Sequence, residues 1–274
     1  MASDVKQIRT RGAYEAQVPL RTLLEDAGRI ERTLDQLAVR RKTLRILAGV
    51  AVLAGVVLFM VSNGLLEFCA VLVLLGGVAL FIYSFIDGAA LLKGRDRVAV
   101  MKGLSEKLQP DAGAQSLFSV RLTLKSQPKV VRTEPCPKRP KGRQQFLEED
   151  FLTLEGKLLD GTVITETVKE LTRKRTFLNS NRKSKTKIRR RYLATLRFVY
   201  PQRLYGDARP ASAALNEQIR LPGCATLRGT RVTEKAIVVK AMVDSKDHLA
   251  QTTTMLSLGA YRILNLARRL AASA

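Results

Sequence analysis

The longest apolar stretch of the chain lies between residues 44 and 86, and it carries one acidic residue, Glu67, and one basic residue at its start. A Ser-Asn-Gly sequence at 62–64 interrupts it with residues that favour a turn. The two apolar segments, about 44–62 and 67–86, are each close to the ~20 residues that a helix needs to cross a ~30 Å hydrocarbon core. A buried hairpin of a water-soluble protein is the alternative, but the length and uniformity of the stretch favour two transmembrane helices.

Basic residues flank the apolar stretch on both sides. They are Arg40, Arg41, Lys42 and Arg45 at its start and Lys93, Arg95, Arg97 and Lys102 after it, whereas the short connection between the segments has none. Because Lys and Arg are enriched on the cytoplasmic side of a membrane, we expect both termini and most of the chain to lie in the cytoplasm. The Arg-, Ala- and Leu-rich composition is typical of a bacterial protein, so the expected location is the bacterial inner (cytoplasmic) membrane.

Small residues recur every seven positions in both apolar segments. They are Ala48, Gly55 and Ser62 in the first segment and Ala70, Gly77 and Ser84 in the second. Small side chains let helices approach closely in lipid, and a seven-residue period predicts a left-handed crossing. If the segments fold back about residue 66, each small residue lies opposite another, for example Gly55 opposite Gly77. This packing seam either joins the two helices of one chain or joins neighbouring copies.

The heptad pattern continues beyond the apolar stretch in both directions. Upstream it comprises Leu20, Leu23, Ala27, Ile30, Leu34 and Leu37, and downstream it comprises Leu91, Val98, Met101 and Leu108. We therefore expect a helical hairpin over residues 20–110, whose two helices, 20–62 and 66–109, extend into the cytoplasm as a coiled-coil stalk. This coil either drives homo-oligomerisation or packs within one chain. Residues 1–19 show no such pattern and are expected to form a flexible tail.

From about residue 111 the apolar period changes to two, as in half-buried strands. Residues 118–124 alternate in this way, and Asp160-Gly161 is a hairpin signal. We expect a cytoplasmic, antiparallel β-rich domain over 111–246, built as a barrel or a sandwich, and an amphipathic helix over 247–274 that packs on it. The apolar face of that helix comprises Leu249, Leu256, Ile263 and Leu270. The expected fold class is α+β.

The formal charge of the chain is +23, from 47 Lys and Arg residues and 24 Asp and Glu residues, and much of it lies in one segment. That segment has no acidic residue and ten basic ones: Arg173, Lys174, Arg175, Arg182, Lys183, Lys185, Lys187, Arg189, Arg190 and Arg191. Strand patterns on both sides of it predict a long basic β-hairpin that extends beyond the sheet. Like charges that face each other across a hairpin repel, so we expect these ten side chains to bind an anionic partner.

Three kinds of anionic partner fit this hairpin: an anionic lipid surface, an acidic protein and a nucleic acid. The chain has no Trp and no helix-turn-helix or RNA-binding signature, which weakens the nucleic-acid alternative. We therefore expect an inner-membrane anchor or scaffold that binds anionic lipid or an acidic protein. The alternatives are a membrane-tethered nucleic-acid-binding protein and a pore-forming or membrane-perturbing effector.

The sequence contains no catalytic motif of the P-loop, G-x-G-x-x-G, G-x-S-x-G or H-E-x-x-H type. Its three cysteines and its single histidine, His248, lack the spacing of a zinc site. Glu148, Glu149 and Asp150 are adjacent, which suits a solvated turn better than paired acid and base groups. We expect a non-enzymatic protein without a metal or another cofactor.

Overall fold

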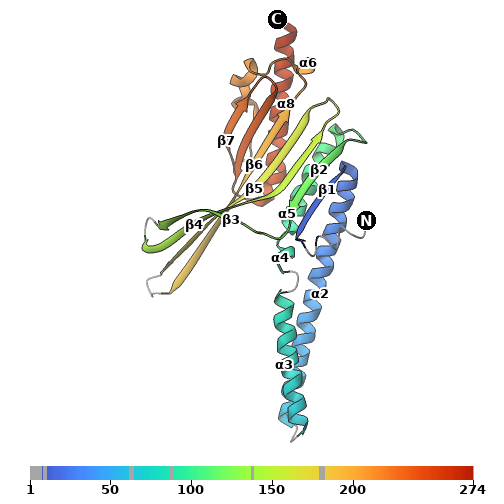
Figure 1. Cartoon of the computed structure of the whole chain (residues 1–274), viewed down its shortest axis with the longest axis vertical. Coiled ribbons are helices and arrows are strands. Elements are labelled where there is room, and N and C mark those ends of the chain that lie inside the picture. The colour runs from blue at the N-terminus through green and yellow to red at the C-terminus, as the bar shows by residue number, and fades with distance from the viewer. Residues whose placement is uncertain are drawn as a thin grey trace.

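The computed structural model of the chain describes residues 8, 11–61, 65–86, 89–136, 139–178 and 183–273. It contains one antiparallel sheet with helices on one face, and a pair of long helices that projects away from the sheet (Figure 1). The fold class is therefore α+β. The strands are β1 (Ala13–Pro19), β2 (Leu117–Thr123), β3 (Lys129–Cys136), β4 (Arg139–Lys157), β5 (Val163–Leu178), β6 (Ser184–Val199), β7 (Ala225–Val232) and β8 (Ala236–Val243). The α-helices are α2 (Leu20–Val61), α3 (Leu65–Ile86), α4 (Ala89–Leu92), α5 (Arg95–Leu108), α6 (Gln202–Tyr205), α7 (Leu215–Gln218) and α8 (Leu249–Ser273), and short 3-10 helices lie at Gln109–Asp111, Pro210–Ala214 and Lys246–His248.

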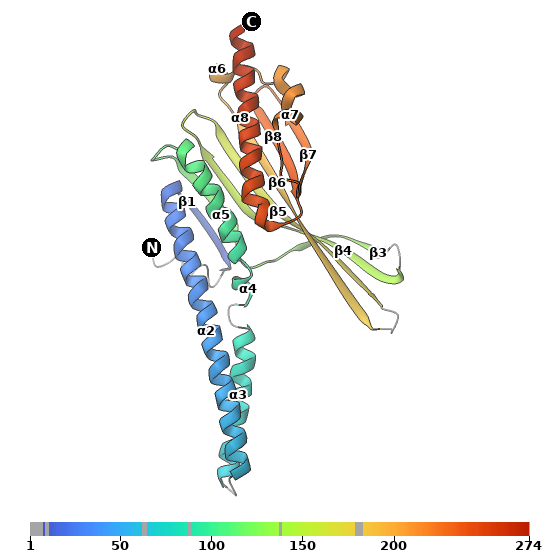
Figure 2. The same ribbon diagram turned by 180° about the vertical axis from the view of Figure 1, so that it is seen from behind.

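The sheet has eight strands in the order β1-β2-β4-β5-β6-β8-β7, with β3 paired to the outer part of β4. Its strands alternate as expected for one apolar face: Phe118, Val120 and Leu122 of β2 are at most 2% exposed. Helices α2, α5 and α8 cover this face (Figure 2). The expected barrel or sandwich is wrong, because within the described residues the edge strands β1 and β7 do not pair and helices supply the second layer.

The first half of α2 packs on the sheet and on α5. Leu23, Ala27 and Leu34 of α2 and Val98 and Met101 of α5 are at most 1% exposed and share one core with the strands. The upstream heptad stripe is therefore covered by the chain's own sheet and α5, and it does not form a separate coiled-coil stalk. This packing leaves the stripe without an exposed face for a second copy.

Residues 13–19, expected to belong to a flexible tail, form the edge strand β1 instead. This strand pairs with β2 along its whole length. Tyr14 is 4% exposed, and its hydroxyl donates a hydrogen bond to Asp26 of α2 at 2.8 Å. The alternation of Tyr14, Ala16 and Val18 is too short to stand out beside the long helical pattern that follows it. Of the rest of the expected tail, the structure describes only residues 8, 11 and 12.

The expected continuous helix over 66–109 is replaced by three helices, α3, α4 and α5. Helix α5 starts directly after Gly94, where a Cβ atom would lie 2.7 Å from the Leu124 carbonyl oxygen. Only glycine fits so close to the end of β2, so the chain turns there and α5 packs along the sheet. Helix α2, by contrast, runs unbroken for 42 residues from the sheet through the apolar stretch.

The outer parts of β4, β5 and β6 leave the sheet together with β3. We call this four-stranded extension the basic arm; it consists of β3, residues 139–149 of β4, 171–178 of β5 and 184–191 of β6. It is thus broader than the expected two-stranded hairpin. At its root β4 has a bulge between Asp150 and Leu152, and such a bulge bends a strand and increases its twist.

The arm slants away from the sheet towards the end of the molecule that carries α3 (Figures 1 and 2). Along the long axis of the molecule, the outer ends of its strands lie level with α4 and with the adjoining end of α3. The helix pair and the arm are therefore two extensions of one domain that point in the same general direction.

Helix α8 lies on β6 and β8. Its residues Leu249, Leu256 and Ile263 are fully buried against the sheet, whereas Leu270 near its C-terminal end is 42% exposed. This helix closes the apolar face on the side of the sheet away from α2.

Candidate membrane and anion-binding surfaces

The surface of the α2–α3 pair beyond the sheet is apolar. Large apolar side chains that are 45–81% exposed line it: Ile46, Leu47, Val50, Leu53, Val57, Phe59, Met60, Val61, Phe68, Leu72, Leu75, Phe81, Ile82 and Phe85. Both helices are long and apolar enough to cross a membrane. Monomeric soluble proteins rarely expose apolar patches larger than a few hundred Å². This surface therefore needs an apolar cover.

The small residues of the packing seam lie between α2 and α3 of the same chain. Ala48, Gly55, Ala70, Gly77 and Ser84 are buried there, and Ser62 lies outside the described residues. The helices are offset from the expected register, so that neither glycine faces the other.

Each seam glycine instead faces a larger residue of the opposite helix. A Cβ atom on Gly55 would lie 2.9 Å from Leu74 Cγ, and one on Gly77 would lie 2.9 Å from Val52 Cγ2 and 3.0 Å from the Val52 nitrogen. A small residue opposite a large one fills the space between two close helices, whereas two opposed glycines would leave a gap.

Arginines of α2 bind the end of α3 that adjoins the domain. Arg41 donates hydrogen bonds from Nε to the Ser84 carbonyl oxygen and from Nη2 to the Phe85 carbonyl oxygen, both at 2.9 Å. The Arg45 guanidinium lies 4.2 Å from the centre of the Phe85 ring. These contacts satisfy carbonyl groups that a helix end leaves without intrahelical partners, and they place cations at the edge of the apolar surface.

The strand register sorts the basic side chains of the arm onto two faces. Residues directly opposite in a sheet share a face, and Arg173 lies opposite Arg189, Arg175 opposite Lys187 and Phe177 opposite Lys185. Six of the ten expected anion-binding residues thus share what we call the cationic face: Arg173, Arg175, Lys185, Lys187, Arg189 and Arg191. Lys174 and Arg190 lie on the other face, Lys183 precedes β6, and Arg182 lies outside the described residues.

The cationic face continues the sheet face that the helices leave open. In β5, Ile164, Glu166 and Val168 are buried under the helices, and Glu170 follows them on that side. The odd-numbered residues, which include Arg173, therefore face away from the helices. The arm presents its largest concentration of charge on a surface that no helix covers.

Only part of this charge is neutralised within the chain. Arg191 is paired with Asp244 at 2.8 Å, and on the other face Arg190 is paired with Glu170 at 3.2 Å. In the described part of the chain, five cations of the cationic face have no carboxylate within ion-pair distance, and one of these, Arg175, hydrogen-bonds the neutral Gln144. The other four are Arg173, Lys185, Lys187 and Arg189.

The cations of this face act on one another. Partial burial lowers the pKa of Arg173, and the positive charges of Arg175, Arg189 and Arg191 lower it further. The guanidinium nevertheless stays protonated, because an arginine pKa lies so far above neutrality. The pKa depression therefore reports a repulsion that an anion would relieve.

The root of the arm is joined to α5 by a buried ion-pair cluster. Arg97 donates from Nη1 to Glu149 Oε1 at 2.9 Å and from Nη2 to Glu149 Oε2 at 2.8 Å, and Nη2 also reaches Glu170 Oε2 at 3.0 Å. Ser126 Oγ donates to Glu149 at 2.6 Å, and the Gln127 amide donates at 3.0 Å. The cluster fixes α5, which follows the apolar helix α3 and the short helix α4 in the chain, against β4 and β5 at the root of the arm.

Burial alone would raise the pKa of Glu149, but the hydrogen bonds from Arg97, Ser126 and Gln127 outweigh it and lower the pKa. For Arg97, burial opposes the charged form, and the contacts with Glu149 and Glu170 raise its pKa instead. Both Arg97 and Glu149 are thus held in their charged forms. The carboxylate at 149 belongs to a paired, buried strand position, and the expectation of a solvated turn is wrong there.

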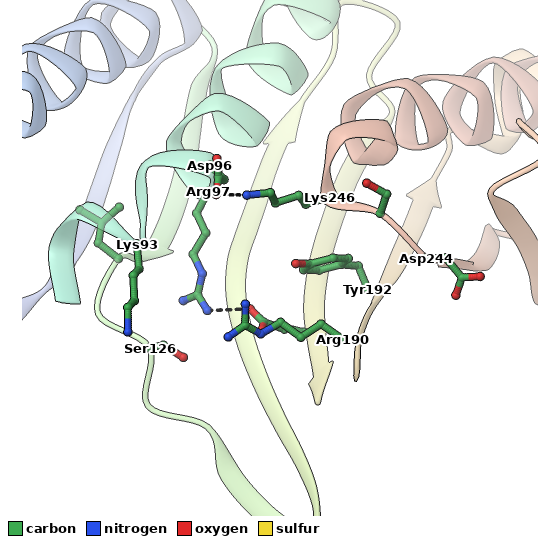
Figure 3. A pocket seen from close by; sticks show the side chains of 11 residues that line it. Lys93, Asp96, Arg97, Ser126, Arg190, Tyr192, Asp244 and Lys246 are labelled. Carbon is green, nitrogen blue, oxygen red and sulfur yellow. Dashed lines mark hydrogen bonds and ion pairs between the residues drawn. The ribbon is translucent and has the colours of Figure 1, made fainter. Parts of the chain in front are cut away.

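A cleft of about 420 Å³ lies beside this cluster, between the start of α5, the root of β6 and the residues before α8 (Figure 3). Arg97 points into it from α5, Arg190 and Tyr192 reach it from β6, and Lys246 pairs with Asp96 across its upper side. Its positive groups are largely paired with carboxylates of the same chain. The cleft is therefore a structural junction more than an open anion site.

The sequence indicates Arg97 only as one of the basic residues that flank the apolar stretch, and it does not predict the ion pair with Glu149. Its partner Glu149 is 52 positions away, and no local pattern links the two. Among the described residues, no group of three or more His, Cys, Asp or Glu side chains is arranged to hold a metal ion. Comparison with protein-family models, with curated proteins and with solved structures found no match to this chain.

Proposed function

We propose that this chain is a non-enzymatic anchor or scaffold of the bacterial inner membrane. Helices α2 and α3 span the bilayer as a hairpin with both termini in the cytoplasm, and the basic arm binds the anionic lipid surface of the same membrane. The observation that carries this proposal is the position of the arm. Its outer end is level with the end of the apolar helix pair that adjoins the domain (Figure 1).

The arrangement of charge supports a lipid partner. Arg41 and Arg45 mark the expected cytoplasmic edge of the bilayer at the end of α3. Each Lys or Arg near an anionic surface contributes about 1 kcal/mol, and the attraction falls off within a Debye length of ~8–10 Å. The four cations Arg173, Lys185, Lys187 and Arg189 would therefore contribute a few kcal/mol only if the arm lies close to the headgroups, and the inclination of the arm towards α3 supports such a position.

The nucleic-acid alternative has less support. Recognition of single strands uses exposed aromatic side chains on which bases stack. Phe146 and Phe177 are the aromatic residues on the described part of the cationic face, and Tyr192 lies on the helix-covered face and is 9% exposed. An acidic protein remains the competing partner, and it is an outcome of the test below.

The test uses the full-length protein in lipid nanodiscs, with either neutral phosphatidylcholine or a mixture containing phosphatidylglycerol. Hydrogen exchange of the arm amides is followed in both. We expect slower exchange in the anionic discs, and loss of this protection at about 1 M salt, where the Debye length is ~3 Å. Equal exchange in both discs would contradict lipid binding and would favour an acidic protein.

Two variants with equal charge change separate a local effect from a general one. In the first, four arm residues are changed to Gln: Arg173, Lys185, Lys187 and Arg189. In the second, four exposed basic residues of the sheet domain are changed to Gln: Arg197, Arg228, Arg231 and Lys240. We expect the first variant to lose the protection and the second to keep it.

A further inference from the structure

A hollow of about 220 Å³ lies on the cationic face near the root of the arm. Phe146, Arg173 and Arg189 lie in one cross-strand row of β4, β5 and β6. The next row towards the sheet contains Glu148, Leu171 and Arg191, in the same strand order. The lining consists of Phe146, Leu147, Glu148, Leu171, Thr172, Arg173, Arg189, Arg191 and Met242.

The charges around this hollow are unbalanced. Arg173 and Arg189 are directly opposite, and like charges in that position destabilise a sheet. The nearby carboxylates already have partners: Asp244 pairs with Arg191 at 2.8 Å, and Glu148 pairs with Lys169 at 3.4 Å. In the described part of the chain, the two opposed guanidinium groups therefore have no carboxylate partner.

The geometry of the two groups favours one class of anion. A guanidinium is planar and offers paired N–H donors that match the oxygens of a phosphate, often in a bidentate manner. A phosphomonoester carries up to two negative charges on one group, which matches two opposed guanidinium groups.

Part of the remaining lining of the hollow is apolar, and Glu148 and Thr172 add polar groups to it. Phe146, Leu171 and Met242 line it beside the arginines, and the Arg132 guanidinium lies 4.5 Å from the centre of the Phe146 ring. An apolar wall next to a phosphate site suits a ligand whose phosphate is attached to a non-ionic body. The volume of the hollow, about 220 Å³, is below the ~300–1,000 Å³ of most small-molecule sites, so the hollow would hold a headgroup and not a large ligand.

We propose that this hollow binds the phosphomonoester group of an amphiphile or a small metabolite, between Arg173 and Arg189. The inference rests on the proposed function, and it adds selectivity to it: a phosphomonoester lipid is bound more tightly than a phosphodiester lipid at the same surface charge. The cations nearer the outer end of the arm, Lys185 and Lys187, supply the unselective attraction.

The absence of Trp from the chain allows a clean reporter. Phe146→Trp places one tryptophan in the wall of the hollow, and Phe177→Trp, further out on the same face, serves as a second reporter if the first disturbs the site. Trp fluorescence of the full-length protein is recorded in phosphatidylcholine nanodiscs, and in discs that contain phosphatidic acid or phosphatidylglycerol at matched surface charge. Inorganic phosphate and methyl phosphate are titrated into the phosphatidylcholine discs.

We expect phosphatidic acid to be preferred over phosphatidylglycerol on the order of tenfold, the value of a good charge-assisted hydrogen bond. Arg173→Gln with Arg189→Gln should abolish this preference. Lys185→Gln with Lys187→Gln removes the same charge from the same face, and it should weaken both responses equally and leave the preference intact.

The outcomes separate the two sources of the phosphate and the two proposals. A preference for phosphatidic acid without a response to methyl phosphate identifies a lipid headgroup, and a saturable response to methyl phosphate that the arginine pair controls identifies a soluble ligand. Equal responses to the two anionic lipids, unchanged by the arginine pair, would overturn the hollow as a site and leave the proposed lipid binding standing. No response to either lipid would overturn the proposed lipid binding, and the hollow would be overturned with it if methyl phosphate also gave no response.

Discussion

The apolar helix pair and the basic arm extend from the same domain towards the same end of the molecule, but the forces within them differ. In the helix pair, seam residues such as Gly55 and Gly77 let the backbones approach, and the exposed surface is apolar. In the arm, backbone pairing holds four strands while opposed cations such as Arg173 and Arg189 repel. The proposed bilayer with anionic headgroups would offer hydrocarbon to the first surface and anions to the second, at neighbouring depths.

The two extensions meet at Arg97, and removing this residue is expected to give the largest effect. Arg97→Met leaves Glu149 buried without its cation, which typically destabilises a protein by about 3–5 kcal/mol. We expect a lower midpoint of chemical unfolding in detergent micelles and faster hydrogen exchange at the root of the arm.

Arg95→Met is the matched control for this change. Arg95 pairs with Asp35 at 2.9 Å, but both side chains are more than half exposed. Exposed pairs contribute about 0–1 kcal/mol, so this variant should unfold close to the wild-type midpoint. Similar losses in the two variants would show that Arg97 is not the joint between the extensions.

A change at the seam addresses the helix pair alone. In Gly77→Leu the new side chain would meet Val52 of α2, with Cβ 2.9 Å from Cγ2, so the helices must separate. Overpacking of this kind costs about 1–3 kcal/mol. We expect a lower thermal midpoint in micelles, without a change in the exchange of the arm.

The neighbouring glycine provides the comparison. A Cβ atom on Gly76 has nothing within 4 Å, so Gly76→Leu adds a side chain on the outer surface of α3. We expect no loss of stability from it. If Gly76→Leu and Gly77→Leu behave alike, the close approach at the seam does not hold the helices together.

The sheet domain and the arm also differ in the environment of an ionisable group without an ion-pair partner: the sheet domain buries a carboxyl group, whereas the arm keeps its cations on an uncovered face. Glu166 lies under α8 and is 1% exposed. Burial raises the pKa of its carboxyl group to about 8, although a hydrogen bond with Thr253 acts in the opposite direction. The folded state then holds a proton that the unfolded chain loses above its ordinary carboxyl pKa. The contribution of Glu166 to stability is therefore fully present below its ordinary carboxyl pKa, falls by up to about 1.4 kcal/mol per pH unit as the pH rises towards 8, and then levels off.

Glu166→Gln should remove this contribution to the pH dependence, because the amide does not titrate. Unfolding midpoints measured at intervals across that pH range test the point. Glu155→Gln, on the exposed face of β4, should keep the wild-type profile. A slope that persists in Glu166→Gln would mean that another group holds the proton.

Much of this arrangement follows from local patterns in the sequence, and the rest depends on contacts between distant residues. A long apolar run predicts helices such as α3 without any tertiary information, and alternation in β6 sorts Lys187 and Ile188 to opposite faces. The same alternation only predicts that a strand has one buried face, so it does not distinguish a barrel from a sheet covered by helices.

Four features had no local signal strong enough to reveal them. Strand β1 is short and adjoins a long helix. The helix break at Gly94 arises from contact with Leu124. The Arg97–Glu149 pair joins segments that only the folded sheet brings together, and the hollow between Arg173 and Arg189 depends on the strand register.

The most direct test of the central claim measures how close the arm lies to lipid. Phe177→Trp on the cationic face and Ile188→Trp on the opposite face are each placed in full-length protein in nanodiscs containing phosphatidylglycerol, with brominated acyl chains as quenchers. We expect stronger quenching at position 177 than at 188, and loss of this difference in phosphatidylcholine discs. Equal and weak quenching at both positions, whatever the lipid charge, would show that the arm does not bind the bilayer.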